Sequence, residues 1–286
     1  MQTSSLLPFL KAKEIIKSLR ILNPSEIHIR DIAMERGAFV RERTLETSEG
    51  RLIRRGRLGI ITVNKEIPER GRKRFAIAHE LGHFELHHES QLIICTEQDM
   101  FLWNESKSQE IEANDFAANI LMPEDIFSDH IGSESPSIDV VAKLADEFRT
   151  TLTATALRYV QLSSVPCAVV VSKDNFVRWY KKSNSFEFHV KVGEKLSPNT
   201  YAFDFFDGIE LPLKSEKVPA SAWIAGNIDE EADIMEHSVA LNRYNVVLSL
   251  LWIHKEIRFK YRRYDEDEPE HDLTNPFTPD GKRWQW

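Results

Sequence analysis

One buried helix is predicted from the stretch Arg74-Phe-Ala-Ile-Ala-His79-Glu80-Leu-Gly-His83-Phe-Glu-Leu-His87-His88. Its apolar side chains cover nearly the whole circumference of such a helix, which is typical of a helix inside a core. His79 and His83 would stand four residues apart on one face, one turn above the other. Buried polar side chains are costly unless a partner satisfies them. A metal ion bound by both imidazoles would be such a partner.

The spacing also indicates which metal and which chemistry. Two neutral imidazoles at i and i+4 suit a zinc ion, and the adjacent Glu80 can take a proton from a water activated by the metal. This is the His-Glu-x-x-His pattern of zinc peptidases. The alternative is a surface helix that spells the motif by chance, which the apolar surroundings disfavour. We therefore predict a zinc centre with His79 and His83 as ligands and Glu80 as general base.

A catalytic zinc ion needs a third protein ligand and keeps one position open. The next predicted helix, which ends at Pro123, offers Glu110 and Glu112. At about 100° per residue, Glu110 shares its face with alanines and a leucine, whereas Glu112 shares its face with polar residues. We therefore predict Glu110 as the third ligand and expect Glu112 to face solvent. Asn114, one turn after Glu110, would either support a metal ligand or simply pack.

Length and composition set the class of protein. The 286 residues suffice for about two domains, and 42% hydrophobic and 29% charged residues suit a soluble globular chain. A net charge of −8 argues against a protein built to coat nucleic acid. No apolar run approaches the ~20 residues of a membrane span, and no signal peptide is recognised. With two distant cysteines, Cys95 and Cys167, a disulfide framework is not expected, and the cytoplasm is the expected compartment.

Helices and strands alternate along the remaining chain. Leu58–Asn64 is expected either to be an edge strand that holds a substrate as an added strand, or to be an ordinary core strand. Arginines cluster at 51–57 and again at 70–74, where they form either a docking surface or a solvated rim. Helices are predicted at 9–22, 25–36, 138–148 and 153–162, and strands at 38–45, 50–63, 167–171, 176–180, 186–192, 234–241 and 246–253.

Two blocks together resemble the ImmA/IrrE family of zinc metallopeptidases. They are Arg74-Phe-Ala-Ile-Ala-His-Glu-Leu-Gly-His-Phe-Glu-Leu-His87 and Glu110-Ile-Glu-Ala-Asn-Asp-Phe-Ala-Ala-Asn-Ile-Leu-Met-Pro123, within a resemblance that covers about residues 25–125. The resemblance implies a cytoplasmic zinc metallo-endopeptidase that makes site-specific cuts in helix-turn-helix transcriptional repressors. Such cuts release stress-response or mobile-element genes. It implies His79, His83 and Glu110 as zinc ligands and Glu80 as general base.

The resemblance also implies an α+β architecture. A gluzincin-like zinc peptidase core is expected at 1–130, a helix-turn-helix-like helical segment at 131–164 and a GAF-like α/β sensor domain at 165–262. The last stretch, 263–286, is acidic and expected to be an extended tail. From the residues alone, the segment after 165 is only β-rich.

Rival functions remain open from the sequence. The helix pair at 138–162 could read DNA, but its second helix offers only Arg158 as a contact, so packing or substrate docking is favoured. A DNA-binding regulator or a ligand-sensing interaction module with a structural zinc site is the alternative, although a structural site needs no Glu80. The expected partners are a repressor as protein substrate and a small-molecule effector at the C-terminal domain, without a membrane. His130, Arg158 and Tyr159 are candidates for stabilising the oxyanion.

Overall fold

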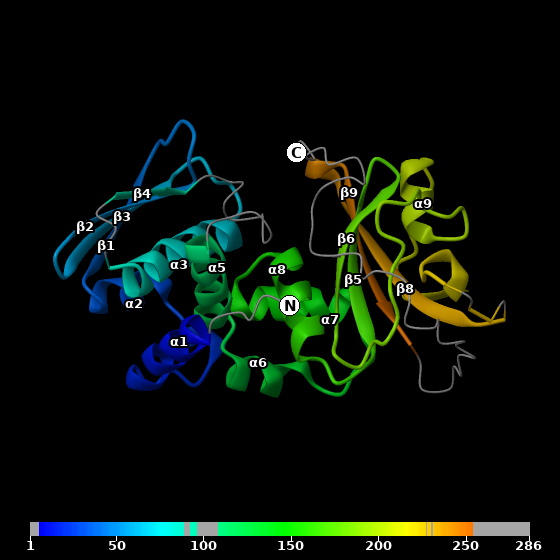
Figure 1. Ribbon diagram of the computed structural model, residues 1–286, viewed down its shortest axis with the longest axis horizontal. Coiled ribbons are helices and arrows are strands. Elements are labelled where there is room, and N and C mark those ends of the chain that lie inside the picture. The colour runs from blue at the N-terminus through cyan, green and yellow to red at the C-terminus, as the bar shows by residue number, and fades with distance from the viewer. Residues whose placement is uncertain (1–5, 89–91, 96–107, 227, 230, 254–286) are drawn as a thin grey trace. The chain divides into compact units, whose positions relative to one another are not determined.

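The computed structural model describes residues 6–88, 92–95, 108–226, 228–229 and 231–253 (Figure 1). The predicted tail at 263–286 lies outside the described residues. The chain forms two compact units, one of residues 1–132 with 143–155 and one of residues 133–142 with 156–286. The boundary runs through the expected helical segment at 131–164, so the division into functional domains stays a prediction.

The first unit contains a four-stranded mixed sheet. The strands are β1 (Ala38–Arg43), β2 (Gly50–Arg55), β3 (Leu58–Asn64) and β4 (Leu92–Cys95), in the order β1-β3-β2-β4. β3 runs parallel to β1 and antiparallel to β2, and β4 runs antiparallel to β2. The stretch predicted as strand at 50–63 forms the two strands of a hairpin, because the chain turns at Gly56, whose φ of 61° favours glycine.

The edge-strand interpretation of Leu58–Asn64 is wrong. β3 is an interior strand of the described sheet, since β1 pairs with the side that β2 leaves open, in the register Ala38↔Gly59. The edges of this sheet, as far as it is described, are β1 and β4. An extended substrate would therefore have to pair with β1 or with β4, and β4 pairs Cys95 with Gly50 of β2.

α2 (Ile29–Glu35) and α3 (Arg70–Leu86) pack on one face of this sheet, and the other helices of the unit lie beyond them (Figure 1). These other helices include α1 (Leu7–Ser18), α5 (Ser108–Leu121) and α6 (Glu124–Ile131). α3 packs against β2 and β3 on one side and against α5 on the other, and α5 also packs on α1. Gly59 permits this layering, because a methyl group there would lie 2.8 Å from the ring of Phe84 on α3. The predicted burial of the central helix is confirmed, with Ala76, Ile77 and Leu81 at most 1% exposed.

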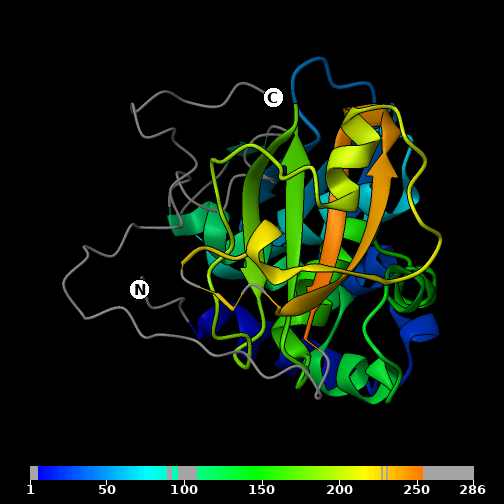
Figure 2. The same ribbon diagram turned by 90° about the vertical axis from the view of Figure 1, so that its right-hand side faces the viewer.

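The second unit is built on a five-stranded antiparallel sheet (Figure 2). Its order is β6-β5-β9-β8-β7, from β5 (Cys167–Lys173), β6 (Phe176–Lys182), β7 (Glu216–Pro219), β8 (Asp233–Leu241) and β9 (Val246–Trp252). The β5–β6 hairpin turns at Asp174-Asn175, both with positive φ. The short helix α9 (Tyr201–Phe206) packs on β8 and β9. The strand predicted at 186–192 is wrong, since only an isolated bridge joins Val190 to Ile224.

The predicted helix pair is present as α7 (Ile138–Phe148) and α8 (Leu152–Leu162). Arg158, the charge on α8 that could contact DNA, is 3% exposed and donates a hydrogen bond to Gln161. Tyr159 is also buried, and this burial is the main cause that raises its pKa to about 12. In the part of the chain that the structure describes, no helix combines the length and apolar character needed to cross a bilayer.

Candidate metal centre

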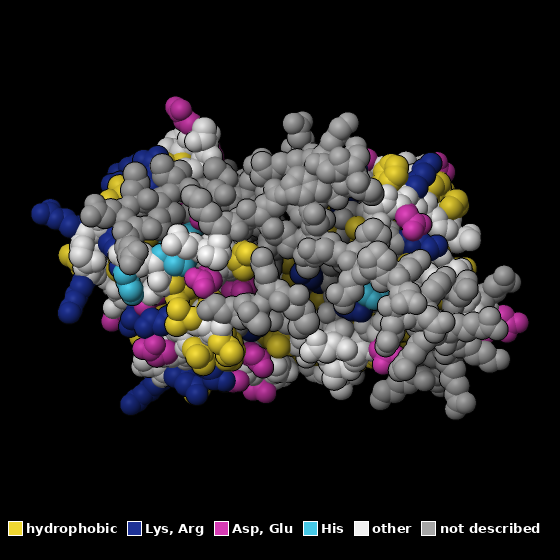
Figure 3. Space-filling view, viewed as in Figure 1, with side chains coloured by type: hydrophobic (Ala, Val, Ile, Leu, Met, Phe, Trp, Pro, Cys, Tyr) yellow, Lys and Arg dark blue, Asp and Glu magenta, His cyan; other side chains and the backbone are white. Residues whose placement is uncertain are grey.

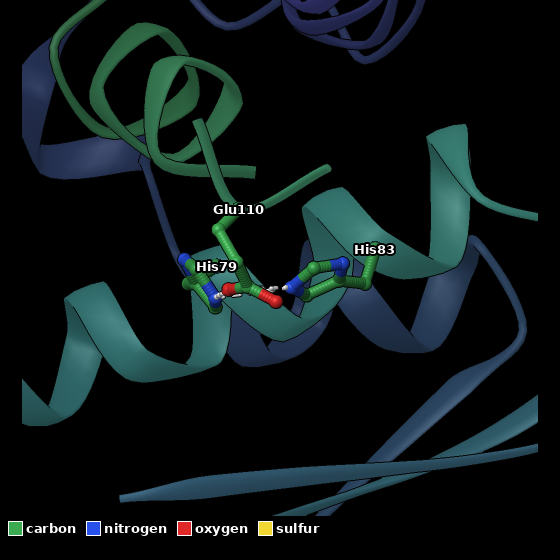
Figure 4. Close-up of side chains that lie close together, drawn as sticks. All are labelled: His79, His83 and Glu110. Atoms are coloured by element: carbon green, nitrogen blue, oxygen red, sulfur yellow. Dashed lines mark hydrogen bonds and ion pairs between the residues drawn. The ribbon is translucent and has the colours of Figure 1, made fainter. Parts of the chain in front are cut away.

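The three predicted ligands come together between α3 and α5 (Figure 4). The Nε2 atoms of His79 and His83 lie 3.1 Å apart, and Oε2 of Glu110 lies 3.1 Å from the first and 3.3 Å from the second. Both imidazoles are buried, and the Glu110 side chain is 14% exposed. Among the described residues, this is the group of metal-binding side chains whose ligand atoms lie within 4.8 Å of one another.

The triangle of donor atoms has the dimensions of a metal site. Zinc bonds of about 2.0–2.1 Å in a tetrahedral arrangement place neighbouring donor atoms about 3.3–3.4 Å apart. The three measured separations are 3.1, 3.1 and 3.3 Å. Two imidazoles and one carboxylate are also the donor set of many catalytic zinc sites, in which a fourth position stays open. The residues present therefore fit a divalent metal ion.

Small residues allow α5 to approach the histidines. A methyl group at Gly82 of α3 would lie 3.1 Å from backbone atoms of Ala113 on α5. This close contact places Glu110, in the first turn of α5, over the face that carries His79 and His83. A carboxylate is favourable in a first helical turn because it faces the positive end of the helix dipole.

The local electrostatics favour the protonation states that bind a metal. Burial opposes ionisation of Glu110, but hydrogen bonds that Nε2–H of His79 and of His83 donate outweigh it and lower the pKa of Glu110 to about 2. A bound metal ion would take the place of these Nε2 protons. Burial also lowers the pKa of His83. At neutral pH the site therefore presents a carboxylate and a neutral imidazole, as metal ligation requires.

Asn114 orients the first histidine. Its Oδ1 lies 2.9 Å from Nδ1 of His79, at a fully buried position. Because an amide oxygen can only accept, the proton of His79 belongs on Nδ1, and the lone pair of Nε2 points into the triangle. Of the two roles considered for Asn114, support of a metal ligand is the one that this contact favours.

A second chain of contacts orients His83. Nδ1 of His83 lies 2.9 Å from Nδ1 of His87, and Nε2 of His87 lies 3.0 Å from Oε2 of Glu112. The Glu112 carboxylate accepts the Nε2 proton of His87, whose Nδ1 then accepts the Nδ1 proton of His83. The lone pair of His83 Nε2 is left facing the triangle. The expectation that Glu112 merely faces solvent is therefore wrong: its side chain is 25% exposed and holds this chain in place.

Glu80 lies in a space that a glycine provides. The Glu80 side chain is fully buried, and a methyl group at Gly50 would lie 2.3 Å from its Oε1. Gly50 is the first residue of β2 and pairs with Cys95 of the edge strand β4. The carboxylate predicted as general base therefore lies beside the edge that could receive a substrate backbone. The sequence motif gives no sign of Gly50, whose importance appears only from this contact.

The arginines of the β2–β3 hairpin divide into two kinds. Arg54 is fixed, because its guanidinium carbon lies 4.2 Å from the Phe84 ring centre and it donates to the Phe84 carbonyl oxygen. Arg55 and Arg57 are exposed. Figure 3 shows several lysine and arginine side chains at the left-hand end of the view, where the sheet of the first unit lies. Of Arg54, Arg55 and Arg57, only the last two therefore present their charge to solvent.

A comparison with protein families points to the class of metallopeptidases. Residues 33–159 match the family model of the IrrE N-terminal-like domain, which is peptidase family M78. The resemblance of the two sequence blocks to the ImmA/IrrE family is thus confirmed for the domain at residues 33–159.

A solved structure supports the fold. The chain is similar to a Mycobacterium tuberculosis transcriptional regulator, with 13% identity and a TM-score of 0.53. The match covers 87% of this chain and 76% of the other. At this identity the likeness concerns the fold alone. No curated protein matches the chain in a sequence search.

Removing the charge of Glu112 should weaken metal binding without abolishing it. Glu112→Gln replaces the acceptor of His87 by an amide, so the orientation of His83 is held less firmly. Outer contacts of this kind contribute about 10- to 100-fold to metal affinity. Competition against a chelator of known affinity measures the change. The exposed Glu124→Gln on α6 is the matched control and should bind zinc as the wild type does. Equal affinity of the Glu112→Gln variant and wild type would remove Glu112 from the site.

Proposed function

We propose that the chain is a zinc-dependent endopeptidase with a gluzincin-like core. His79, His83 and Glu110 would hold the zinc ion, and Glu80 would act as general base. The observation that supports this most is the convergence of three ligand atoms at 3.1–3.3 Å, with Asn114 and the His87–Glu112 pair setting the tautomers of the histidines. Membership of a peptidase family supports the same reaction.

The catalytic roles of the residues follow from their positions. A zinc ion bound there would supply Lewis-acid chemistry, which acidifies a water molecule and polarises a peptide carbonyl. The Glu80 carboxylate takes the proton from the attacking water and can return it to the leaving amine. The edge strand β4 offers main-chain hydrogen bonds to an extended substrate beside Glu80. His130, one candidate for oxyanion stabilisation, bonds through Nδ1 to the Ile126 carbonyl oxygen, which leaves its Nε2 for other contacts.

The substrate we propose is a helix-turn-helix transcriptional repressor in the cytoplasm, whose cleavage would release stress-response or mobile-element genes. Binding through β4 would make few sequence demands, so selectivity has to come from a folded docking surface. Arg55 and Arg57 supply exposed positive charge for such a surface. The second unit, with its five-stranded sheet, would act as a GAF-like sensor that responds to a small effector.

A DNA-binding regulator with a structural metal is the second candidate. The solved structure similar to this chain is described as a transcriptional regulator, which favours this reading. Two observations weigh against it. Arg158 on α8 is buried, so α8 loses its DNA-contacting charge, and a structural metal site has no use for Glu80 beside its ligands.

The expected substrate behaviour separates the two candidates. The purified protein should cut a repressor encoded beside its own gene at one site, and should leave unfolded casein largely intact. A chelator should stop the cleavage and added zinc should restore it. Electrophoresis and mass spectrometry of the products give the cut site. An intact repressor together with tight, specific DNA binding by this chain would favour the regulator, and broad digestion of casein would contradict the proposed selectivity.

A further inference from the structure

A cavity of about 320 Å³ opens in the first unit, away from the metal centre. The start of α3 lines it through Arg70, Lys73, Arg74 and Ile77, which recur at helical spacing and share one face. His79 lies half a turn around α3 from Arg70, so the cavity and the metal ligands occupy nearly opposite faces of the same helix. The remaining lining comes from His28–Asp31, Glu42 and Arg149.

Positive charge dominates the lining. With His28 neutral, five cationic side chains and two carboxylates leave three net positive charges. Glu42 is already engaged, because it pairs with Arg30 and lies 2.9 Å from Nζ of Lys73. Within the described residues, no ion pair joins Arg70, Arg74 or Arg149 to a carboxylate. A cavity with this imbalance attracts an anion.

Two of these arginines are held side by side. Nη2 of Arg74 and Nη2 of Arg149 both donate to the backbone carbonyl oxygen of Ile27, at 3.0 and 3.1 Å. Their Nε atoms are buried and meet no hydrogen-bond acceptor among the described residues. Burial first, and then the charges of Arg149 and Arg70, lower the pKa of Arg74 to about 10. Gathering buried like charges is unfavourable unless an anion compensates them.

A purely structural role accounts for only part of the arrangement. Arg149 donates to the carbonyl oxygens of Pro24, Ser25 and Ile27, and so ties down the turn before α2. This uses one nitrogen of the guanidinium and leaves Nε unmatched. It gives no reason for Arg70, which is exposed in the first turn of α3, where the helix dipole disfavours a cation. Arg149 also has a φ of 56°, a backbone conformation that usually selects glycine or asparagine.

We propose that this cavity binds a small phosphate monoester, with its phosphoryl group held by Arg70, Arg74 and Arg149. Guanidinium groups form bidentate hydrogen bonds with phosphate oxygens. A phosphate dianion also balances three positive charges better than the single negative charge of a carboxylate does. The volume is about ten times the ~30 Å³ share of one water molecule, so room remains for a small organic group beyond the phosphate. It also lies at the lower end of the roughly 300–1,000 Å³ of ligand pockets.

Calorimetric titration of the full-length, zinc-loaded protein tests the proposal. The probes are inorganic phosphate, glycerol 3-phosphate and, as the uncharged counterpart, glycerol. One saturable site is expected for the two phosphates and none for glycerol, with weaker binding at high salt. Arg70→Gln should weaken phosphate binding by at least about tenfold, because it removes a charge-assisted hydrogen bond. The exposed Arg55→Gln, outside the cavity, is the matched control and should bind as wild type does.

Phosphate can also bind a metal ion, and one further variant separates the two sites. A His79→Ala protein should keep its phosphate affinity, since the cavity lies on the other face of α3. Arg70 is exposed, so the Arg70→Gln variant should fold, and weaker phosphate binding can be attributed to the lost charge. A variant of the buried Arg74 could instead lose binding by unfolding. The proposal is overturned by no saturable binding of either phosphate at millimolar concentration. It is equally overturned by unchanged affinity in Arg70→Gln, or by loss of binding in His79→Ala alone.

Discussion

The Glu80→Gln protein is expected to bind zinc like the wild type and to lose cleavage activity by at least about 100-fold. General-base catalysis contributes typically 10²–10⁴-fold, and an amide cannot accept the proton of the attacking water. Glutamine has nearly the size of glutamate, so it fits the space that the absence of a side chain at Gly50 provides. Metal analysis and a cleavage time course on the repressor measure the two properties separately.

The Glu124→Gln variant on α6 serves as the control, because it makes the same chemical change at an exposed position. It should retain both zinc and activity. Full cleavage by the Glu80→Gln variant would show that another group takes the proton. Loss of zinc from it would instead make Glu80 part of the metal site, in conflict with the triangle formed by His79, His83 and Glu110.

Replacing a histidine of the triangle is expected to remove the metal. His79→Ala or His83→Ala should reduce bound zinc from about one per chain to nearly none, because two protein ligands hold zinc far more weakly than three. Glu110→Gln should also lose most of its zinc, since a neutral amide oxygen is a poorer ligand than a carboxylate. The expected order of loss is largest for the two histidines, then Glu110→Gln, then Glu112→Gln.

This order distinguishes ligands from the residues that orient them. Elemental analysis after gel filtration measures the bound zinc, and circular dichroism checks that each variant is folded. Zinc contents that are equal in the wild type and both histidine variants would contradict the site. Glu110 contacts His83 and is assigned as a ligand, whereas Glu112 contacts His87 and is assigned as an orienting residue. A larger loss of zinc in Glu112→Gln than in Glu110→Gln would contradict this assignment.

The local pattern suffices to predict the helices of the site. Apolar residues around α3 indicate its burial, and helical periodicity distinguishes Glu110 from Glu112, because both signals depend only on neighbours in the chain. The structure accordingly brings Glu110 to His79 and His83. The hairpins at Asp174-Asn175 and at 242–245 are predictable for the same reason, since turn residues mark them.

Long-range pairing could not be predicted in this way. Nothing within Leu58–Asn64 reveals that β1 pairs with its free side, so an interior strand resembles an edge strand in the sequence. The alternation at 186–192 resembles a strand but finds no partner strand in the described sheet. Likewise, Glu112 meets His87 across two helices, and Gly50 meets Glu80 from a strand. These contacts depend on how distant segments pack.

Anomalous X-ray scattering at the zinc absorption edge, from crystals of the purified protein, tests the metal centre most directly. We expect one strong peak inside the triangle, about 2.0–2.2 Å from Nε2 of His79, Nε2 of His83 and a carboxylate oxygen of Glu110. A zinc-bearing protein whose peak lies elsewhere, or whose triangle shows no peak, would contradict the assignment of these three ligands.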